Sequence, residues 1–225
     1  MTFAKVTHVI FDLDGLMLDT ERIYQQVLHF IAAKHDAKYT LETKLKIQGT
    51  TEIYTAETVI ADMNLPYTPE EFLEVYWQLA TEPVKHAKLM PGVTKLVRHL
   101  HEHKIPICIA TSCGRAAHEV KTQDYRKLMS LFSHVVCGPE VKHGKPAPDI
   151  FLMAAAKFDD APQPKDCLVF EDAPNGARGA VAAGMQVVLV PDPDVPEKWR
   201  KPATLVLNSL EEFQPEAFGL PRYDD

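Results

Sequence analysis

Residues 7–20 read THVIFDLDGLMLDT, and this stretch contains the first predicted strand and the first candidate site residues. Its first half is a short apolar run rich in β-branched residues, which is typical of a buried strand. Asp12 and Asp14 stand where that strand ends, and Gly15 follows, whose missing side chain permits an unusual turn. Ligands of open α/β sheets bind at the carboxyl ends of strands, so both aspartates are candidate site residues. Alone, the D-x-D pair is equally typical of a turn.

Five further apolar runs rich in valine and isoleucine follow: Ile105–Thr111, His134–Cys137, Leu168–Phe170, Val187–Val190 and Leu205–Leu207. Helical patterns separate most of them, at about 91–103, from Pro148 onward, and over Ala173–Ala183, where Gly184 suits a left-handed cap. Strands that alternate with helices predict an α/β fold with a doubly wound, Rossmann-like parallel sheet.

Residues 20–88 interrupt this alternation, because they contain several amphipathic helical patterns and no convincing strand. We expect Thr20 to cap a helix whose apolar stripe is Ile23, Val27, Phe30 and Ile31. Residues 68–71, TPEE, have the composition of a capping box with proline at the first helical position. The stripe that follows is assigned to packing within the insertion: Phe72, Val75, Tyr76 and Leu79. The predicted domains are therefore an α/β core, 1–19 and 89–225, and a helical insertion, 20–88.

Composition limits the class of partner. A formal net charge of −7 argues against general binding to nucleic acid polymers or anionic membranes, so the expected partner is a small molecule. No apolar run reaches the length of about 20 residues that a membrane span needs, and the N-terminal run does not resemble a signal peptide. Three of the four cysteines lie in apolar runs, which fits reduced thiols in a cytoplasmic protein. We expect a monomer.

Three other segments place polar groups at or just beyond predicted strand ends. IPICIATS ends with Thr111 and Ser112, HGKPAPDIF offers Lys145 ahead of a helix, and CLVFED ends with Glu171 and Asp172. Each segment has a plain structural explanation, as a helix cap, a solvated charge or turn-forming acids. Four such segments in one chain instead predict a site with clustered carboxylates, an ammonium group and hydroxyls. That set suits Mg²⁺ and a phosphate group.

These four segments resemble the four motifs of the haloacid dehalogenase superfamily, and the match covers the chain nearly end to end. The helical insertion is similar to the mobile α-helical cap that this superfamily carries after its first strand. More narrowly, five segments resemble the pseudouridine-5'-phosphatases of the superfamily: DLDGLMLDTER, KLMPG, HGKPAPDIF, CLVFEDAPNG and FGLPRY. The resemblance implies a phosphatase that hydrolyses a small phosphate monoester through a phospho-aspartate, with pseudouridine 5'-phosphate as the expected substrate.

When the motif residues of the superfamily are matched to this sequence, the resemblance implies that Asp12 is the nucleophile and that Asp14 is the acid/base. A carboxylate nucleophile divides hydrolysis into two steps, and a second carboxyl group two residues away can manage protons. Three residues are implied to bind the transferred phosphate, and their hydrogen bonds and charge would stabilise the transition state: Thr111, Ser112 and Lys145.

The resemblance also implies how Mg²⁺ is held. Its ligands would be the carboxylate of Asp12, the backbone carbonyl of Asp14 and the carboxylate of Asp172, with Glu171 as a further ligand or an outer-shell partner. Residues 48–50, QGT, form a turn between two helical patterns that by resemblance faces the active site, although a simple helix–helix turn explains it equally well. Cys113 follows Ser112, and its thiol could make the site sensitive to oxidation.

Two other interpretations remain open from the sequence. A phosphosugar mutase or a sugar-phosphate phosphatase would use the same four motifs, and the cap would decide whether water reaches the phospho-aspartate. A phospho-receiver-like signalling or binding protein also combines a doubly wound sheet, an acidic cluster and a lysine. Such a protein lacks a helical insertion of this kind, and phosphate release from a generic aryl phosphate would distinguish it from an enzyme.

Overall fold

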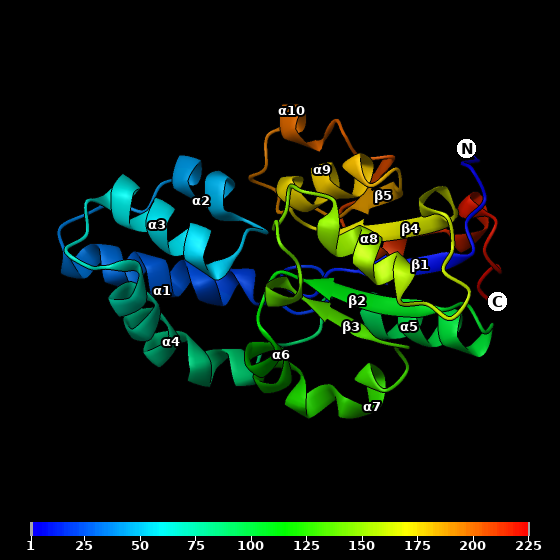
Figure 1. Cartoon of the computed structure of the whole chain (residues 1–225), viewed down its shortest axis with the longest axis horizontal. Coiled ribbons are helices and arrows are strands. Elements are labelled where there is room, and N and C mark those ends of the chain that lie inside the picture. Colours follow the sequence, from blue (N-terminus) through cyan, green and yellow to red (C-terminus); the bar gives the residue numbers. More distant parts are fainter. Residues whose placement is uncertain (1, 225) are drawn as a thin grey trace.

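The computed structural model describes residues 2–224, and its centre is one parallel sheet with the order β3-β2-β1-β4-β5-β6 (Figure 1). The six strands are β1 (His8–Phe11), β2 (Ile107–Thr111), β3 (Val135–Cys137), β4 (Cys167–Glu171), β5 (Gln186–Leu189) and β6 (Leu205–Val206). Strand β1 lies in the middle, with Val9 opposite Ile107 of β2 and Leu168 of β4. The doubly wound α/β prediction is confirmed, and each predicted strand lies within two residues of its observed bounds.

Helices cover both faces of the sheet (Figure 1). On one face α8 (Asp149–Ala156) and α9 (Pro174–Ala182) pack over a buried layer that includes Ile10 and Val169. The opposite face of the sheet is lined by a second cluster of buried apolar residues, which includes Val9 and Phe11. This face is covered by α5 (Val93–Glu102), α7 (Arg126–Met129) and the 3₁₀ turns η4 (Leu210–Glu212) and η5 (Pro215–Phe218). Alternate residues of β1 thus enter opposite layers, as strand geometry requires.

The remaining short elements connect these layers. They are α6 (Arg115–Thr122), α10 (Glu197–Arg200), η1 (Gln123–Tyr125), η2 (Gly138–Glu140) and η3 (Pro164–Asp166). No helix within residues 2–224 is long and apolar enough to cross a membrane.

Four helices lie between β1 and α5 and gather beside the sheet (Figure 1). They are α1 (Glu21–Lys34), α2 (Leu41–Ile47), α3 (Glu52–Met63) and α4 (Pro69–Lys85), and α4 packs against both α1 and α3. The capping box that begins α4 is present as predicted. The backbone N–H of Glu71 donates to the Thr68 hydroxyl at 3.3 Å, and the Glu71 carboxylate accepts from the Thr68 N–H at 2.8 Å.

Three details of this helical segment differ from expectation. Thr20 does not cap α1, because its backbone is already helical and its hydroxyl donates to Asp14 instead. Phe30 does not belong to the buried stripe, since it is 47% exposed. Tyr76 is buried, but it lines a cavity shared with the sheet as well as the interior of the segment. The differences at Thr20 and Tyr76 arise because α1 and α4 contribute to the cavity beside the sheet.

The two chain connections that join the helical segment to the rest of the protein lie next to each other. The Asp19 N–H donates to the Lys88 carbonyl at 2.9 Å, and the Met90 N–H donates to the Met17 carbonyl at 2.9 Å. Leu18 and Leu89 form an antiparallel bridge between these bonds. The two connections therefore run side by side, next to the carboxyl end of β1.

Candidate active site

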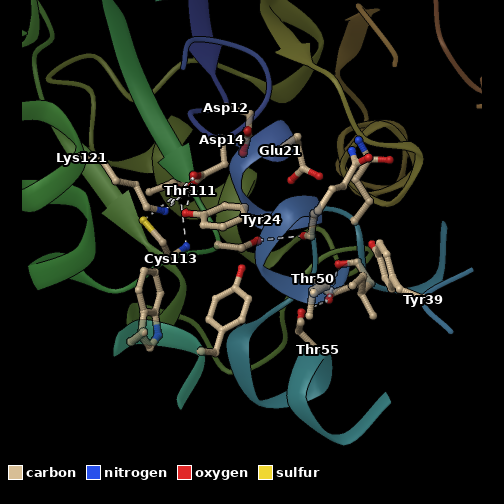
Figure 2. Close-up of a pocket in the computed structure, with 18 residues that line it drawn as sticks. Asp12, Asp14, Glu21, Tyr24, Tyr39, Thr50, Thr55, Thr111, Cys113 and Lys121 are labelled. Atoms are coloured by element: carbon tan, nitrogen blue, oxygen red, sulfur yellow. Dashed lines mark hydrogen bonds and ion pairs between the residues drawn. The ribbon is translucent and has the colours of Figure 1, made fainter. Parts of the chain in front are cut away.

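The predicted site residues converge at the carboxyl ends of the central strands. Asp12 directly follows β1, while Thr111 ends β2 and Glu171 ends β4, the two strands that flank β1. Because parallel strands end at the same edge of a sheet, three distant parts of the chain meet there. Figure 2 shows Asp12, Asp14 and Thr111 around the upper part of the cavity that lies beside this edge.

Lys145 is buried between two carboxylates. Its Nζ donates to Asp12 Oδ1 at 2.5 Å, to Glu171 Oε1 at 2.6 Å and to the Ala110 carbonyl at 3.3 Å. Burial by itself would lower the pKa of Lys145, but the two carboxylates hold that pKa above its ordinary value. The lysine is therefore a fixed positive charge next to Asp12.

Three acidic side chains form a compact group of oxygen donors. Asp12, Glu171 and Asp172 offer carboxylate oxygens that lie within 4.8 Å of one another. Glu171 is already engaged, because its Oε2 accepts from the backbone N–H groups of Asp172 at 3.1 Å and Ala173 at 3.0 Å. Its Oε1 accepts from Lys145. The carboxylates of Asp12 and Asp172 are thus better placed than Glu171 to bind a cation.

The buried carboxylates of this group favour the binding of a cation. Burial, then Glu171, raises the pKa of Asp172 well above its ordinary value. Burial also raises the pKa of Asp12 to about 8, against the opposing charge of Lys145. Gly15 makes room for this arrangement, since a Cβ there would collide with Asp172 Oδ2. Crowded, buried oxygen donors of this kind fit a hard divalent ion such as Mg²⁺.

Asp14 is held by a different set of partners. Its Oδ1 accepts from the Thr20 hydroxyl at 2.8 Å and the Tyr24 hydroxyl at 3.1 Å. Lys121 Nζ donates to both carboxylate oxygens, at 2.8 and 2.9 Å. Burial alone would raise the pKa of Asp14, but the charge of Lys121 and these hydrogen bonds hold it below its ordinary value. Asp14 is therefore a carboxylate in this structure.

The loop after β2 contributes hydroxyl and thiol groups. The Thr111 hydroxyl lies 3.2 Å from Cys113 Sγ and 3.5 Å from Asp14 Oδ2, and the Ser112 hydroxyl donates to the Gly49 carbonyl at 2.9 Å. Cys113 is buried, and its burial raises the pKa of its thiol to about 12. The sensitivity to oxidation that we considered for Cys113 is therefore disfavoured, because reaction requires a thiolate.

The turn between α2 and α3 lies against this edge of the sheet. Gln48 Nε2 donates to Asp172 Oδ2 at 2.9 Å, and the Gln48 carbonyl accepts from Asn175 Nδ2 at 2.8 Å. Gly49 has a positive φ of 75°, which glycine adopts without strain. The turn is therefore more than a helix connection, since it contacts the acidic group directly.

The cavity next to the acidic group is lined from both sides. The sheet side supplies Asp12, Asp14 and the loop after β2, while aromatic side chains of the helical segment line the other side: Tyr24, Tyr39, Tyr76 and Trp77. Polar and charged groups at one end and aromatic groups at the other suit a ligand with an anionic and an organic half.

Comparison with known proteins assigns the family. A model of the haloacid dehalogenase-like hydrolases matches residues 9–190 of this chain. The chain belongs to this family. A relative 47% identical over 98% of this chain and 97% of its own length is a probable pseudouridine-5'-phosphatase of Drosophila melanogaster. A second relative, (DL)-glycerol-3-phosphatase 2 of Arabidopsis thaliana, is 43% identical over 99% of this chain and 95% of its own length.

Solved structures agree on the fold. The β-phosphoglucomutase of Clostridium difficile superimposes with a TM-score of 0.77, at 21% identity, over 94% of each chain. At that identity the likeness shows the fold alone. The family membership and the fold make this chain a haloacid dehalogenase-like hydrolase, as its sequence motifs predict.

Sequence reasoning did not anticipate several contacts of this hydrolase. Thr20, Tyr24 and Lys121 were not linked to Asp14, although all three hydrogen-bond to it. Lys121 lies 107 residues from Asp14 within a polar helix, where nothing local distinguishes it from a solvated lysine. Its burial, at 1% exposure, is the signal, and only the fold provides that signal.

Proposed function

We propose that this hydrolase is a Mg²⁺-dependent phosphatase that transfers the phosphoryl group of a small monoester to Asp12 and then to water. The observation that carries the proposal is Lys145, buried between Asp12 and Glu171 next to Asp172. A fixed ammonium group at this position offsets the repulsion between the Asp12 carboxylate and an incoming phosphate dianion. The phosphatases among the similar proteins support the same reaction class.

In the first step a carboxylate oxygen of Asp12 attacks phosphorus, and the bond between phosphorus and the ester oxygen breaks. Asp14, in its protonated form, gives its proton to the departing oxygen, so the organic product leaves as an alcohol. Thr111 and Ser112 donate hydrogen bonds to the transferred phosphoryl group in this scheme, and Lys145 neutralises part of its charge.

In the second step Asp14, now a carboxylate, takes a proton from water. The water oxygen attacks phosphorus, the bond from Asp12 to phosphorus breaks, and inorganic phosphate leaves. The partners of Asp14 found here support this second role, because Lys121, Thr20 and Tyr24 favour the carboxylate.

The residues present fit the metal of the proposal. Asp12 and Asp172 would hold Mg²⁺ with their carboxylates, Asp14 would contribute its backbone carbonyl, and Glu171 would act from the outer shell. When bound, Mg²⁺ would neutralise charge on the transferred phosphate. Chelation with EDTA should abolish phosphate release, Mg²⁺ should restore it, and Ca²⁺ should inhibit it because its coordination is larger and less regular.

We propose pseudouridine 5'-phosphate as the substrate and pseudouridine as the product. The relative at 47% identity over nearly the whole chain supports this choice. Aromatic residues of the cavity, such as Tyr24 and Trp77, provide flat apolar surfaces that suit a base. In this proposal residues 20–88 act as a cap whose side chains contact the organic part of the substrate.

The second candidate substrate is glycerol 3-phosphate, because a glycerol-3-phosphatase is 43% identical over a similar length. The phosphate-binding groups of the sheet would be the same for both esters, so the cap residues must discriminate. A phosphosugar mutase is a weaker alternative, because the superfamily motifs alone support it and the likeness to a β-phosphoglucomutase shows only the fold.

Phosphate release from purified protein tests these assignments. We expect kcat/KM for pseudouridine 5'-phosphate to exceed that for uridine 5'-phosphate, glycerol 3-phosphate and hexose phosphates, without any sugar bisphosphate activator. A preference of about 10-fold, roughly 1.4 kcal/mol, for one of the other esters would overturn the substrate and leave the phosphatase in place. Absence of phosphate release from every ester, p-nitrophenyl phosphate included, would refute the phosphatase itself.

The four free thiols, Cys108, Cys113, Cys137 and Cys167, are all buried. They support the proposal that this hydrolase works in a reducing compartment such as the cytoplasm.

A further inference from the structure

The candidate site contains two buried lysines, and each donates to different carboxylates; of the two, Lys121 lines the cavity. Lys145 donates to Asp12 and Glu171, whereas Lys121 donates to both oxygens of Asp14 at 2.8 and 2.9 Å. The side chain of Lys121 is only 2% exposed. Burying an ammonium group is costly unless it is paired, so a lysine at this position requires its carboxylate partner, and the carboxylate requires the lysine.

Lys121 also contacts the helical segment. Its Nζ lies 5.3 Å from the ring centroid of Tyr24 on α1 and 5.8 Å from that of Trp77 on α4. Both distances are within the range of a cation–π contact. Both rings line the cavity, and Figure 2 shows Lys121 and Tyr24 directed toward Asp14. One side chain of α6 thus meets the acid/base candidate and two helices of the segment at once.

The other partners of Asp14 do not replace this lysine. The Thr20 and Tyr24 hydroxyls both donate to Oδ1, and the Thr111 hydroxyl lies 3.5 Å from Oδ2. Lys121 is the partner that holds both oxygens, so it fixes the plane of the carboxylate. A carboxylate held by two bonds to one ammonium has little freedom to rotate, and the position of its proton-transferring oxygen is then defined.

We propose that Lys121 is a positioning residue of this hydrolase, which holds the Asp14 carboxyl group for proton transfer. The inference rests on the proposed phosphatase function and deepens it. Lys121 acts through Asp14, whereas Lys145 is the lysine that donates to Asp12.

The experiment compares esters that need a leaving-group proton with one that does not. Pseudouridine 5'-phosphate and glycerol 3-phosphate expel alkoxides, whereas p-nitrophenyl phosphate expels a stabilised phenolate. With the aryl ester the first transfer needs no proton from Asp14, so a burst of p-nitrophenolate reports that transfer, whereas the steady-state rate on every ester includes hydrolysis of the phospho-aspartate, in which Asp14 is the base. The variants are Lys121→Met, which keeps the length of the side chain, Lys121→Arg, and Lys127→Met as an exposed control.

We expect Lys121→Met to lower the steady-state kcat by about 100-fold on all three esters, while the burst of p-nitrophenolate keeps roughly its wild-type amplitude. Lys121→Arg should recover most of the lost activity, and Lys127→Met should match the wild type. In an Asp14→Asn background, Lys121→Met should cost little more, because both changes remove the same function. Thermal unfolding checks that each variant is folded.

Loss of the burst in the same proportion as the steady-state rate would overturn the inference, because a purely structural lysine changes the amount of active protein for both. Full additivity with Asp14→Asn would also overturn it. Inactivity of the wild type on all three esters has a different meaning, since it would refute the phosphatase and the inference together.

Discussion

Gln48 Nε2 donates a hydrogen bond of 2.9 Å to Oδ2 of Asp172, a residue 124 positions later in the chain. The contact joins the α2–α3 turn to the carboxyl end of β4. Asn175 adds a second bond to the same turn, through the Gln48 carbonyl at 2.8 Å. A side chain of the helical segment therefore orients a carboxylate that we propose as a metal ligand.

Gln48→Ala is expected to weaken Mg²⁺ binding by about 10- to 100-fold, because ligands lose affinity when their outer hydrogen bonds are removed. Titration of activity with Mg²⁺, together with the Mg²⁺ dependence of the melting temperature, measures the change. Gln26→Ala is the control, since Gln26 is exposed on α1. An unchanged Mg²⁺ requirement in Gln48→Ala would show that this bond does not support the metal.

Asp12→Asn is expected to remain folded and to lose turnover by about 10⁴-fold or more, because an amide is a poor nucleophile. The amide oxygen can still accept from Lys145, so the contact at 2.5 Å need not be lost. Phosphate release and the melting temperature check both parts. Substantial steady-state activity in this variant would exclude Asp12 as the residue that carries the phosphoryl group.

Asp172→Asn tests the charge of the acidic group without measuring activity. Burial and then Glu171 raise the pKa of Asp172, so the folded metal-free protein binds a proton that the unfolded chain has lost. A raised carboxyl pKa makes stability fall as pH rises. We therefore expect Asp172→Asn to raise the melting temperature of metal-free protein, by about 2–4 °C for each kcal/mol gained, and more at pH 8 than at pH 5.

The same variant should lose stabilisation by Mg²⁺, which the wild type should show. Asp159→Asn, at an exposed position, is the control and should change neither property. A metal-free Asp172→Asn protein that melts below the wild type would contradict this account of the acidic group.

Gly15→Ala tests the space around Asp172. Gly15 has a φ of 84°, and a Cβ there would collide with Asp172 Oδ2. Gly184 has a similar φ of 79° at the end of α9, but a Cβ there meets only Pro164 at 3.8 Å. We expect both alanine variants to lose stability, by about 1 kcal/mol or more, and only Gly15→Ala to lose activity strongly. Equal kcat/KM values for the two would disprove the steric argument.

Cys113 is expected to resist alkylation in the folded protein. Burial raises the pKa of its thiol to about 12, so roughly one thiol in 10⁴ is ionised at pH 8. Treatment with iodoacetamide followed by peptide mass spectrometry should find Cys113 unmodified until denaturant is added. Rapid labelling of the native protein at this residue would contradict the assignment.

Residues at strand ends could be located from the sequence, because the apolar runs define the strands and parallel strands end at one edge. This reasoning brought Asp12, Thr111 and Glu171 together. It could not identify Lys121 as a partner of Asp14, because that contact depends on which face α6 turns toward the sheet. Thr20 illustrates the reason: a threonine before a helix normally caps it, yet here a buried carboxylate nearby competes successfully for its hydroxyl.

The paired connections at Asp19–Lys88 and Met17–Met90 have an evolutionary consequence. Since the two ends of the helical segment lie a hydrogen bond apart, the chain between them can be shortened, lengthened or replaced without moving the sheet. A protein built this way can acquire new substrates by exchanging one insert while its strand ends keep the same phosphate chemistry. Grafting the corresponding segment of a relative between Leu18 and Leu89 should therefore transfer selectivity, provided that the graft keeps the contacts of Thr20 and Tyr24 with Asp14 and of Gln48 with Asp172.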